Sequence, residues 1–363
     1  MPMPYVPASL PLENLDYKRL IGLVGEANTK LAEYNGLLQS MVNPAILLSP
    51  LTNQESVLSS KIEGTQATID EVLQHDAGQK FADEKERDIQ EIINYRSAIM
   101  QSYKELVDRP LSLNFIKMLH TILMDSVRGK DKNPGQFRKE QNWIGLPGCT
   151  MDTATFVPPS PFTLMDHLEN WISYINLNEV DPLIQVAIIH AQFEIIHPFL
   201  DGNGRIGRLL IPLFLFYKKR ISEPMFYLSE YLEKNRAQYY CELQGITSRS
   251  AWNDWIAFFL NAICEQSTMN IEKTKKIMSI YEELRYKIPE LTKSQYSQNL
   301  LDMLFEKPVF NISNLILKYN IPKSTAPRLV KAILDAGIIE ELKPAAGRVS
   351  ATYWFPRLLT TVR

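Results

Sequence analysis

The stretch HPFLDGNGRIGR, residues 197–208, decides the fold of this 363-residue chain. The segment before it, residues 182–196, is apolar on almost every face, which predicts a buried helix that Pro198 prevents from continuing. After it, a second helix is predicted to begin at Gly204 and to run into the apolar stretch of residues 209–217. Two buried helices joined by a short glycine-rich loop predict a mainly α-helical core.

This loop has the composition of a phosphate-binding site. A glycine-rich turn that enters a helix presents unpaired N–H groups and the positive end of the helix dipole to an anion. Arg205 and Arg208 lie three residues apart, so they can bind oxygens of one polyphosphate. Asp201 is suited to hold Mg²⁺ between phosphates, and His197 to act as a general base. Each residue alone is common in capped helix turns, but their combination in this order favours the phosphate site.

A metal site is the rival interpretation of the same region. His190, Glu194 and His197 have the spacing His-x3-Glu-x2-His, which can place all three on one helical face. The pattern differs from His-Glu-x-x-His, and no fourth ligand is evident. We therefore expect His190 to be a packed core histidine and Glu194 to have a partner within the helix.

Apolar periodicity and capping residues predict the other helices. One helix is expected from Thr52 or Asn53 to a C-cap at Gly64, after an interruption at Pro50, and Thr68 with Glu71 forms a capping box for the next. Further helices are predicted over residues 15–49, 83–107, 112–124, 164–177, 181–196, 229–244 and 252–288.

Two segments interrupt this helical pattern. Between residues 128 and 161, glycines and prolines surround two β-prone runs, which predicts a β-hairpin flap that turns near residues 146–150. Residues 291–363 carry 10 Lys or Arg and 5 Asp or Glu, and they read as helix, short turn, helix and a β-wing that turns at Ala346-Gly347. A winged helix-turn-helix is predicted, with Lys323 to Leu334 as its recognition helix.

Composition excludes several classes of protein. A net charge of −2 provides no global attraction to DNA or anionic membranes. Three widely spaced cysteines, Cys149, Cys241 and Cys264, suit a reducing compartment rather than a disulfide framework. The first 15 residues lack the features of a signal peptide, and the longest apolar run, at residues 209–217, is too short to span a bilayer. We expect a cytoplasmic protein with no membrane contact.

Residues 197–208 resemble the signature of the Fic family, His-x-Phe-x-Asp/Glu-Gly-Asn-Gly-Arg-x-x-Arg, at every defined position. Similarity to the family also covers the flap and the segments around residues 228–243 and 252–260. The resemblance implies a Fic-type helical bundle that transfers AMP from ATP to a Ser, Thr or Tyr hydroxyl of a target protein, with Mg²⁺ or Mn²⁺ as cofactor. A lysine at position 204, as in the kinase-like Doc branch, is absent here, which favours AMP transfer.

The resemblance assigns roles residue by residue. His197 is the expected base, Asp201 the metal ligand and Phe199 the buried anchor of the loop. ATP is expected to contact the backbone and side chains of Gly202, Asn203, Gly204, Arg205, Ile206, Gly207 and Arg208. Tyr239 and Tyr240 are candidates for flanking adenine, and core positions for both rings are the alternative.

The pattern SSKIEG at residues 59–64 resembles the inhibitory helix of many Fic proteins. The similarity implies that Glu63, together with Ser59 one turn earlier, engages Arg208 and blocks its contact with the γ-phosphate. Without the resemblance, a surface glutamate before a C-cap glycine is the favoured explanation of the pattern.

Four regions are therefore expected. Residues 1–110 would form an N-terminal helical region with the inhibitory helix at about 53–64, and residues 111–270 the Fic core. Residues 271–290 would form a helical linker, and residues 291–363 the winged unit, which could contact DNA or protein. The flap is expected to bind the target by β-strand addition. The chain itself as a target and a homodimer stay open, as do two other functions, a DNA-binding regulator that senses ATP and a hydrolase that removes AMP.

Overall fold

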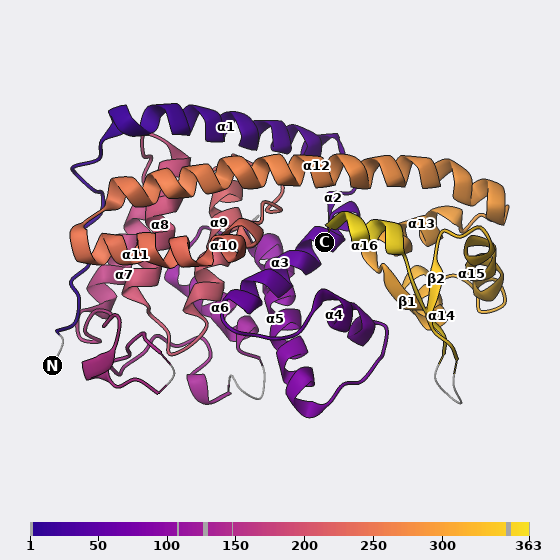
Figure 1. Cartoon of the computed structure of the whole chain (residues 1–363), viewed down its shortest axis with the longest axis horizontal. Helices are drawn as coiled ribbons and strands as arrows, with labels where there is room; N and C mark the ends of the chain where they lie inside the picture. Colours follow the sequence, from indigo (N-terminus) through magenta and orange to yellow (C-terminus); the bar gives the residue numbers. More distant parts are fainter. Residues whose placement is uncertain (1–2, 107–108, 126–129, 147, 346–349, 363) are drawn as a thin grey trace.

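The computed structural model describes residues 3–106, 109–125, 130–146, 148–345 and 350–362. Within them the chain is mainly α-helical, with one three-stranded antiparallel sheet near the C-terminus (Figure 1). The elements of the first 292 residues are α1 (Tyr17–Ser40), α2 (Pro44–Leu47), α3 (Ser49–Ile62), α4 (Ile69–Asp76), α5 (Asp83–Leu106), α6 (Leu113–Leu123), the 3-10 turns η1 (Lys130–Lys132) and η2 (Met151–Thr153), α7 (Leu164–Asn176), α8 (Pro182–Ile196), α9 (Asn203–Tyr217), α10 (Ser229–Lys234), α11 (Arg236–Arg249) and α12 (Trp252–Thr292).

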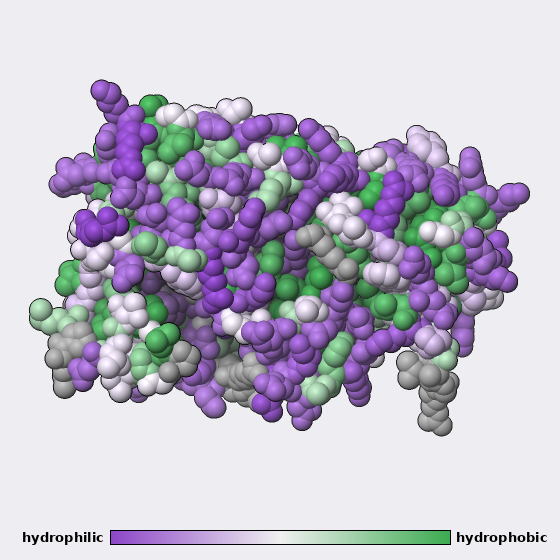
Figure 2. Space-filling view, viewed as in Figure 1, coloured by the Kyte–Doolittle hydropathy of each residue, from purple (hydrophilic) through white to green (hydrophobic). Residues whose placement is uncertain are grey.

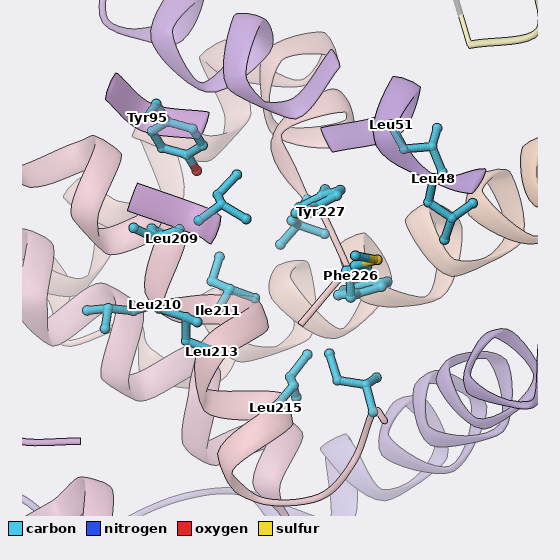
Figure 3. Packing of buried hydrophobic residues seen from close by; sticks show 14 of the residues in the cluster. Leu48, Leu51, Tyr95, Leu209, Leu210, Ile211, Leu213, Leu215, Phe226 and Tyr227 are labelled. Carbon is cyan, nitrogen blue, oxygen red and sulfur yellow. The ribbon is translucent and has the colours of Figure 1, made fainter. Parts of the chain in front are cut away.

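The predicted pair of buried helices forms the centre of the fold. In α8 only Pro182 and Glu194 are not fully buried, and in α9 burial extends from Asn203 to Leu215. Figure 3 shows the α9 leucines and Ile211 packed towards Tyr227 and Phe226 of the following segment. Helices that are apolar all round need protein on every side, so α7, α12, α5 and α6 pack around this pair.

The long helices α1 and α12 lie side by side across one face of the molecule (Figure 1). Tyr34 of α1 is completely buried, and its hydroxyl donates a hydrogen bond of 2.6 Å to the carbonyl oxygen of Met225. Helix α12 runs without a break through residues 270 and 290, where two domain boundaries are predicted. One hydrophobic cluster continues along it from α8 and α9 to the C-terminal elements.

The predicted starts of three helices agree with the structure. Ser112 caps α6, Asp181 caps α8, and Thr68 forms the predicted capping box with Glu71 at the start of α4. The predicted start of the helix before Gly64 at Thr52 or Asn53 is wrong, because α3 begins at Ser49 and Pro50 occupies its first turn. A proline is tolerated there since the first N–H groups of a helix have no partner within it.

Three other expectations need correction. The helix predicted over residues 15–49 ends at Ser40, and residues 229–244 form two helices that meet at Asn235. The flap is not a β-hairpin, because it contains a single antiparallel bridge between Ile144 and Phe156, followed by no ladder in the described residues. Prolines at positions 158, 159 and 161 lack the N–H groups that a longer ladder needs.

The C-terminal elements form a small helical unit with a sheet of order β1-β3-β2. They are α13 (Ser297–Glu306), β1 (Val309–Asn311), α14 (Ile312–Tyr319), α15 (Ala326–Asp335), β2 (Glu340–Lys343), β3 (Thr352–Trp354) and α16 (Pro356–Val362). Strand β3 pairs antiparallel with both neighbours, with Tyr353 opposite Phe310 and Glu341. The turn predicted at Ala346-Gly347 lies outside the described residues.

This unit contacts the segment that carries Glu63. Asn311 donates to the carbonyl oxygen of Ala77 at 2.7 Å, and Ser49 at the start of α3 donates to that of Glu306 at 3.0 Å. Leu73 and Ala77 pack with Val309 and Leu359 in a small apolar cluster. Helix α3 therefore packs against α5, α9 and α10 as well as α13 and α16, and α4 packs against α5 and β1 (Figure 1).

Among the described residues, no helix is long and apolar enough to cross a membrane. Figure 2 shows a face dominated by hydrophilic residues, with smaller hydrophobic areas between them.

Replacing Tyr34 with Phe should lower the free energy of unfolding by about 1–3 kcal/mol, because the buried Met225 carbonyl loses its donor. Urea unfolding at neutral pH measures this loss. Tyr217→Phe is the matched control: the Tyr217 hydroxyl donates to Asn176 at an exposed site, and its loss should change the value by less than about 0.5 kcal/mol. Equal losses for the two variants would contradict the packing of α1 described above.

Candidate active site

The loop between α8 and α9 is shaped by two residues in the left-handed conformation. His197 ends α8 with φ 49° and ψ 61°, and Gly202 precedes α9 with φ 78°. Gly202 adopts this conformation without the strain that a Cβ atom would add. Its own Cβ position is also crowded, at 3.1 Å from Leu123 and 3.2 Å from Met124. The reversal turns His197, Asp201 and the start of α9 towards one region.

Phe199 anchors the loop in the core, as expected, and Asn203 closes it. Phe199 is fully buried. The Asn203 side chain accepts from the Phe199 N–H and donates to the Phe199 carbonyl oxygen, both at 2.9 Å. Its amide is therefore occupied by the loop itself, and only the backbone of Asn203 is free to take part in an anion site.

Two residues that sequence analysis missed also hold this loop. The His120 ring stacks on Phe199 at 3.8 Å, and its Nδ1 accepts from the Gly135 N–H at 2.8 Å. Because Nδ1 accepts, Nε2 carries the proton that is donated to the Asp201 carbonyl oxygen at 3.1 Å. Arg138 is buried and donates to the carbonyl oxygen of His197 at 2.9 Å.

His197 is half-buried and suited to accept a proton. Its Nδ1 lies 3.2 Å from the Glu194 carbonyl oxygen, which can only accept, so Nδ1 carries the hydrogen. Nε2 then has a lone pair and no partner among the described residues. Loss of hydration lowers the pKa of His197 to about 4, against the opposing effects of Glu194, Glu63 and Asp201. The imidazole is therefore neutral at physiological pH.

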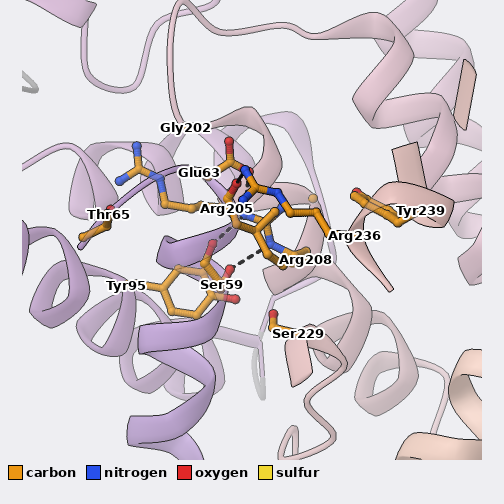
Figure 4. Close-up of polar contacts among 12 residues, drawn as sticks. Ser59, Glu63, Thr65, Tyr95, Gly202, Arg205, Arg208, Ser229, Arg236 and Tyr239 are labelled. Carbon is orange, nitrogen blue, oxygen red and sulfur yellow. Dashed lines mark hydrogen bonds and ion pairs between the residues drawn. The ribbon is translucent and has the colours of Figure 1, made fainter. Parts of the chain in front are cut away.

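Arg208 is engaged by α3, 145 residues upstream. Its guanidinium is buried and donates to the Ser59 hydroxyl and carbonyl, each at 2.9 Å, and to Glu63 Oε1 at 2.7 Å (Figure 4). The Glu63 carboxylate also reaches Gly204, where a Cβ atom would lie 2.1 Å from Oε1. Burial raises the pKa of Glu63, but attraction to Arg208 outweighs it and leaves the net pKa below the ordinary value.

Asp201 lies at the outer end of the loop with an exposed side chain. Its Oδ1 accepts from the Gly202 N–H at 2.5 Å and from Arg205 at 3.3 Å. The Arg205 side chain is buried and also reaches Glu91 at 3.4 Å. The two arginines therefore have different partners. Arg205 pairs with Glu91 and Asp201, whereas Arg208 bonds to Ser59 and Glu63.

The two candidate tyrosines differ in burial, and Tyr239 occupies the core position that is the alternative to adenine contact. Tyr239 is buried, and its hydroxyl lies 2.9 Å from Nε2 of His190. Nδ1 of His190 bonds to the Gly207 carbonyl oxygen at 2.9 Å, so His190 is a core histidine with both nitrogens occupied. Tyr240, which is 44% exposed, is the remaining candidate for contact with the base.

Two residues of α9 that are expected to contact ATP, Ile206 and Gly207, lie against other parts of the protein. Ile206 is completely buried, and a Cβ atom on Gly207 would lie 2.2 Å from Glu194 Oε1, so both residues serve the packing of α9 against α8. Among the residues that the structure describes, Glu194 Oε1 has no hydrogen-bond partner, and burial raises the pKa of Glu194 to about 8. The partner within the helix that was predicted for Glu194 is therefore missing for this atom.

Comparisons with known proteins agree with this geometry. The Fic/DOC family N-terminal model matches residues 21–104, and the Fic/DOC family model matches residues 110–215. A protein adenylyltransferase Fic of Drosophila grimshawi is 26% identical over 270 residues, 72% of this chain and 50% of that protein. A probable protein adenylyltransferase of Aquifex aeolicus is 29% identical over 169 residues, 45% of this chain and 48% of that protein. The chain thus spans half or less of the length of these relatives.

Two solved structures have the same fold. A Fic family protein from Desulfovibrio desulfuricans G20 has a TM-score of 0.60 at 19% identity, over 97% of this chain and 98% of that one. Fic-1 from Caenorhabditis elegans has a TM-score of 0.52 at 19% identity, over 72% of this chain and 73% of that one. With two adjacent family models that together match just over half of its residues, the chain belongs to the Fic/DOC family.

Proposed function

We propose that the protein is an adenylyltransferase that transfers AMP from ATP to hydroxyl groups of proteins, with this chain itself among the candidate targets. The observation that carries the proposal is a neutral His197 with a free Nε2 in the same loop as the N-terminus of α9. A base beside an anion-binding helix end is the arrangement that phosphoryl chemistry on a hydroxyl requires. The names of the Fic relatives support transfer of AMP.

In the proposed reaction the hydroxyl oxygen of the target attacks the α-phosphorus of ATP. His197 Nε2 takes the hydroxyl proton, and the bond from the α-phosphorus to the bridging oxygen breaks and releases pyrophosphate. The N–H groups at the start of α9 are positioned to bind phosphate oxygens, and Arg205 to balance their charge.

The proposed cation, Mg²⁺ or Mn²⁺, fits this donor set. Among the described residues, no three His, Cys, Asp or Glu side chains gather into a protein-only metal site. Asp201 offers an exposed carboxylate beside the loop, and one carboxylate combined with substrate phosphates is a common way to bind Mg²⁺. When bound, the cation would neutralise phosphate charge.

We further propose that the pairing of Glu63 with Arg208 is inhibitory. A carboxylate against Gly204 lies where an anionic ligand of the helix end would lie, and it pairs there with the Arg208 guanidinium. The end of α3 is held by two more contacts, Arg236 to the Ile62 carbonyl oxygen at 2.5 Å and Lys61 to Glu233 at 3.2 Å. Release would therefore require the end of α3 to move.

The flap is the proposed binding site for the target segment. Trp143, Ile144 and Leu146 are exposed on it, at 43%, 37% and 81%. The Val157 carbonyl is occupied by the N–H of Tyr5 at 3.0 Å, so the N-terminal segment covers one edge of the outgoing strand. Addition of a target strand is therefore proposed along the incoming segment, residues 142–146, where main-chain bonds would provide affinity.

Residues 291–363 are proposed to form a winged helix. The order α13, β1, α14, α15, β2 and β3, with an antiparallel sheet, supports this assignment. In the predicted recognition helix, Lys323 and Lys331 are exposed, whereas Arg328 donates to the Thr292 carbonyl oxygen at 3.1 Å. Contact of this unit with DNA or with a protein partner is consistent with those charges, and an ATP-sensing regulator is the alternative function.

Replacement of Glu63 by Gly should raise AMP transfer several-fold or more, because Arg208 loses its anionic partner and the α9 end is cleared. Incorporation of label from α-labelled ATP, with Mg²⁺ and cell lysate, measures the effect. The mass gained by the modified protein separates AMP from phosphate. The double variant with His197→Ala should bind ATP and transfer nothing, and unchanged labelling after either substitution would contradict the corresponding role. Loss of AMP from a pre-modified target would instead favour the hydrolase.

The rate of transfer by the Glu63→Gly protein should stay high at mildly acidic pH. His197 acts as a base only when neutral, so activity is present above its pKa, which is about 4 with Glu63 in place, and is lost as pH falls through it. Glu63 raises this pKa, so its removal should not move the loss of activity to higher pH. Rates between pH 4 and 8, with circular dichroism to confirm folding, measure the midpoint. A midpoint near the ordinary histidine value of about 6.5 would show that burial does not set the behaviour of this group.

A further inference from the structure

Arg138 is a buried arginine whose partners are all backbone carbonyls. It is 3% exposed. Its side chain donates to the carbonyl oxygens of His197 at 2.9 Å, Pro159 at 2.6 Å, Glu140 at 3.2 Å and Ile196 at 3.4 Å. Its own N–H donates to the Pro198 carbonyl oxygen at 2.9 Å. Within the part of the chain that the structure describes, it forms no ion pair.

These partners fall into two groups. Residues 196–198 are the last turn of α8 and its exit, and their carbonyls lack helical donors. A positive charge at this end also complements the helix dipole. Glu140 and Pro159 belong to the incoming and outgoing halves of the flap. One guanidinium therefore connects both halves of the flap to the residue that carries the base.

The backbone of His197 needs such support. Its left-handed conformation is unusual for a residue other than glycine, and its imidazole direction follows from that backbone. Asn142, also in the flap, adds a second and longer contact of 3.4 Å to the same carbonyl oxygen. Burial lowers the pKa of Arg138 to about 10, so its charge persists at neutral pH next to His197.

We propose that Arg138 is a positioning residue of the transfer reaction, which fixes His197 relative to the target hydroxyl held by the flap. This inference rests on the proposed function. It assigns Arg138 no contact with ATP, because every donor with a partner is directed at carbonyls of the loop and flap. Its effect must therefore appear in the chemical step and in His197, not in nucleotide binding.

The test compares Arg138→Gln and Arg138→Lys in the Glu63→Gly protein. Arg138→Gln removes the charge and most donors, so kcat should fall by about 10- to 100-fold, the range expected when reacting groups are misplaced by about 1 Å. The KM for ATP and the ATP dissociation constant from calorimetry should change less than about two-fold. Arg138→Lys keeps the charge without the fork, so it should recover only part of kcat.

The second measurement does not depend on AMP transfer. NMR of a protein with labelled histidines follows the titration of His197, with the resonance assigned by His197→Ala. Among the charged groups that act on His197, Arg138 lowers its pKa, whereas Glu63 and Asp201 raise it. Its loss in Arg138→Gln should raise the pKa of His197, whereas Arg138→Lys should leave it near the parent value. Arg285→Gln, at an exposed arginine of α12, is the matched control and should change nothing.

The two measurements separate the possible outcomes. A folded Arg138→Gln protein with unchanged kcat, or with a raised KM and an unchanged kcat, would overturn the proposal. If the Glu63→Gly parent shows no AMP transfer, the proposed function fails, and the NMR titration still decides the role of Arg138. A pKa of His197 that does not move overturns it, and a rise supports it. If Arg138→Gln does not fold, Arg138→Lys decides through kcat, since full activity without the fork contradicts positioning.

Discussion

The buried guanidinium of Arg208 is the constraint on which the rest of the site depends. A charge that is removed from water needs partners, and the core around α9 is almost entirely apolar. Ser59 and Glu63 provide those partners from a helix remote in sequence. The requirement fixes where α3 must lie, and α3 in turn determines what reaches the start of α9. The same contact thus satisfies a structural need of the fold and engages the arginine that is proposed to bind phosphate.

Glycines set the distances in this arrangement. At position 204 the missing side chain is what allows Glu63 to approach the start of α9, and at position 207 it allows α8 to bring Glu194 close. An alanine at either position would collide with a carboxylate. Several residues of the motif are therefore needed for close packing of the loop and helices. Asn203 is a further case, because its side chain bonds to the backbone of Phe199 and not to an external group.

Sequence predicted the features that depend on neighbouring residues. The capping box at Thr68, the reversal at residues 197–204 and the i, i+4 spacing of Ser59 and Glu63 all follow from local rules. Contacts between segments that are distant in the sequence could not be predicted from local patterns. A histidine in an amphipathic helix gives no sign that it will stack on Phe199, and Arg138 in a flap looks like a surface residue until the end of α8 is placed beside it. The choice between a core position and adenine contact for Tyr239 was open for the same reason, because only the packed helices show that its hydroxyl faces His190.

Helix α12, with its 41 residues, extends about 60 Å at 1.5 Å per residue. Lys273 lies near its middle and bonds at once to Gln54 of α3, Glu230 of α10 and the Val362 carbonyl oxygen of α16. Helix α3, which engages Arg208, is thus bonded to α12, and the same lysine of α12 also bonds to α10 and to the C-terminal helix α16. Withdrawing Glu63 by a movement of the whole of α3 would require the contacts along the helix to break together, including the bond from Lys273 to Gln54. Fraying of its last turn would require only the contacts of Lys61, Ile62 and Glu63 to break.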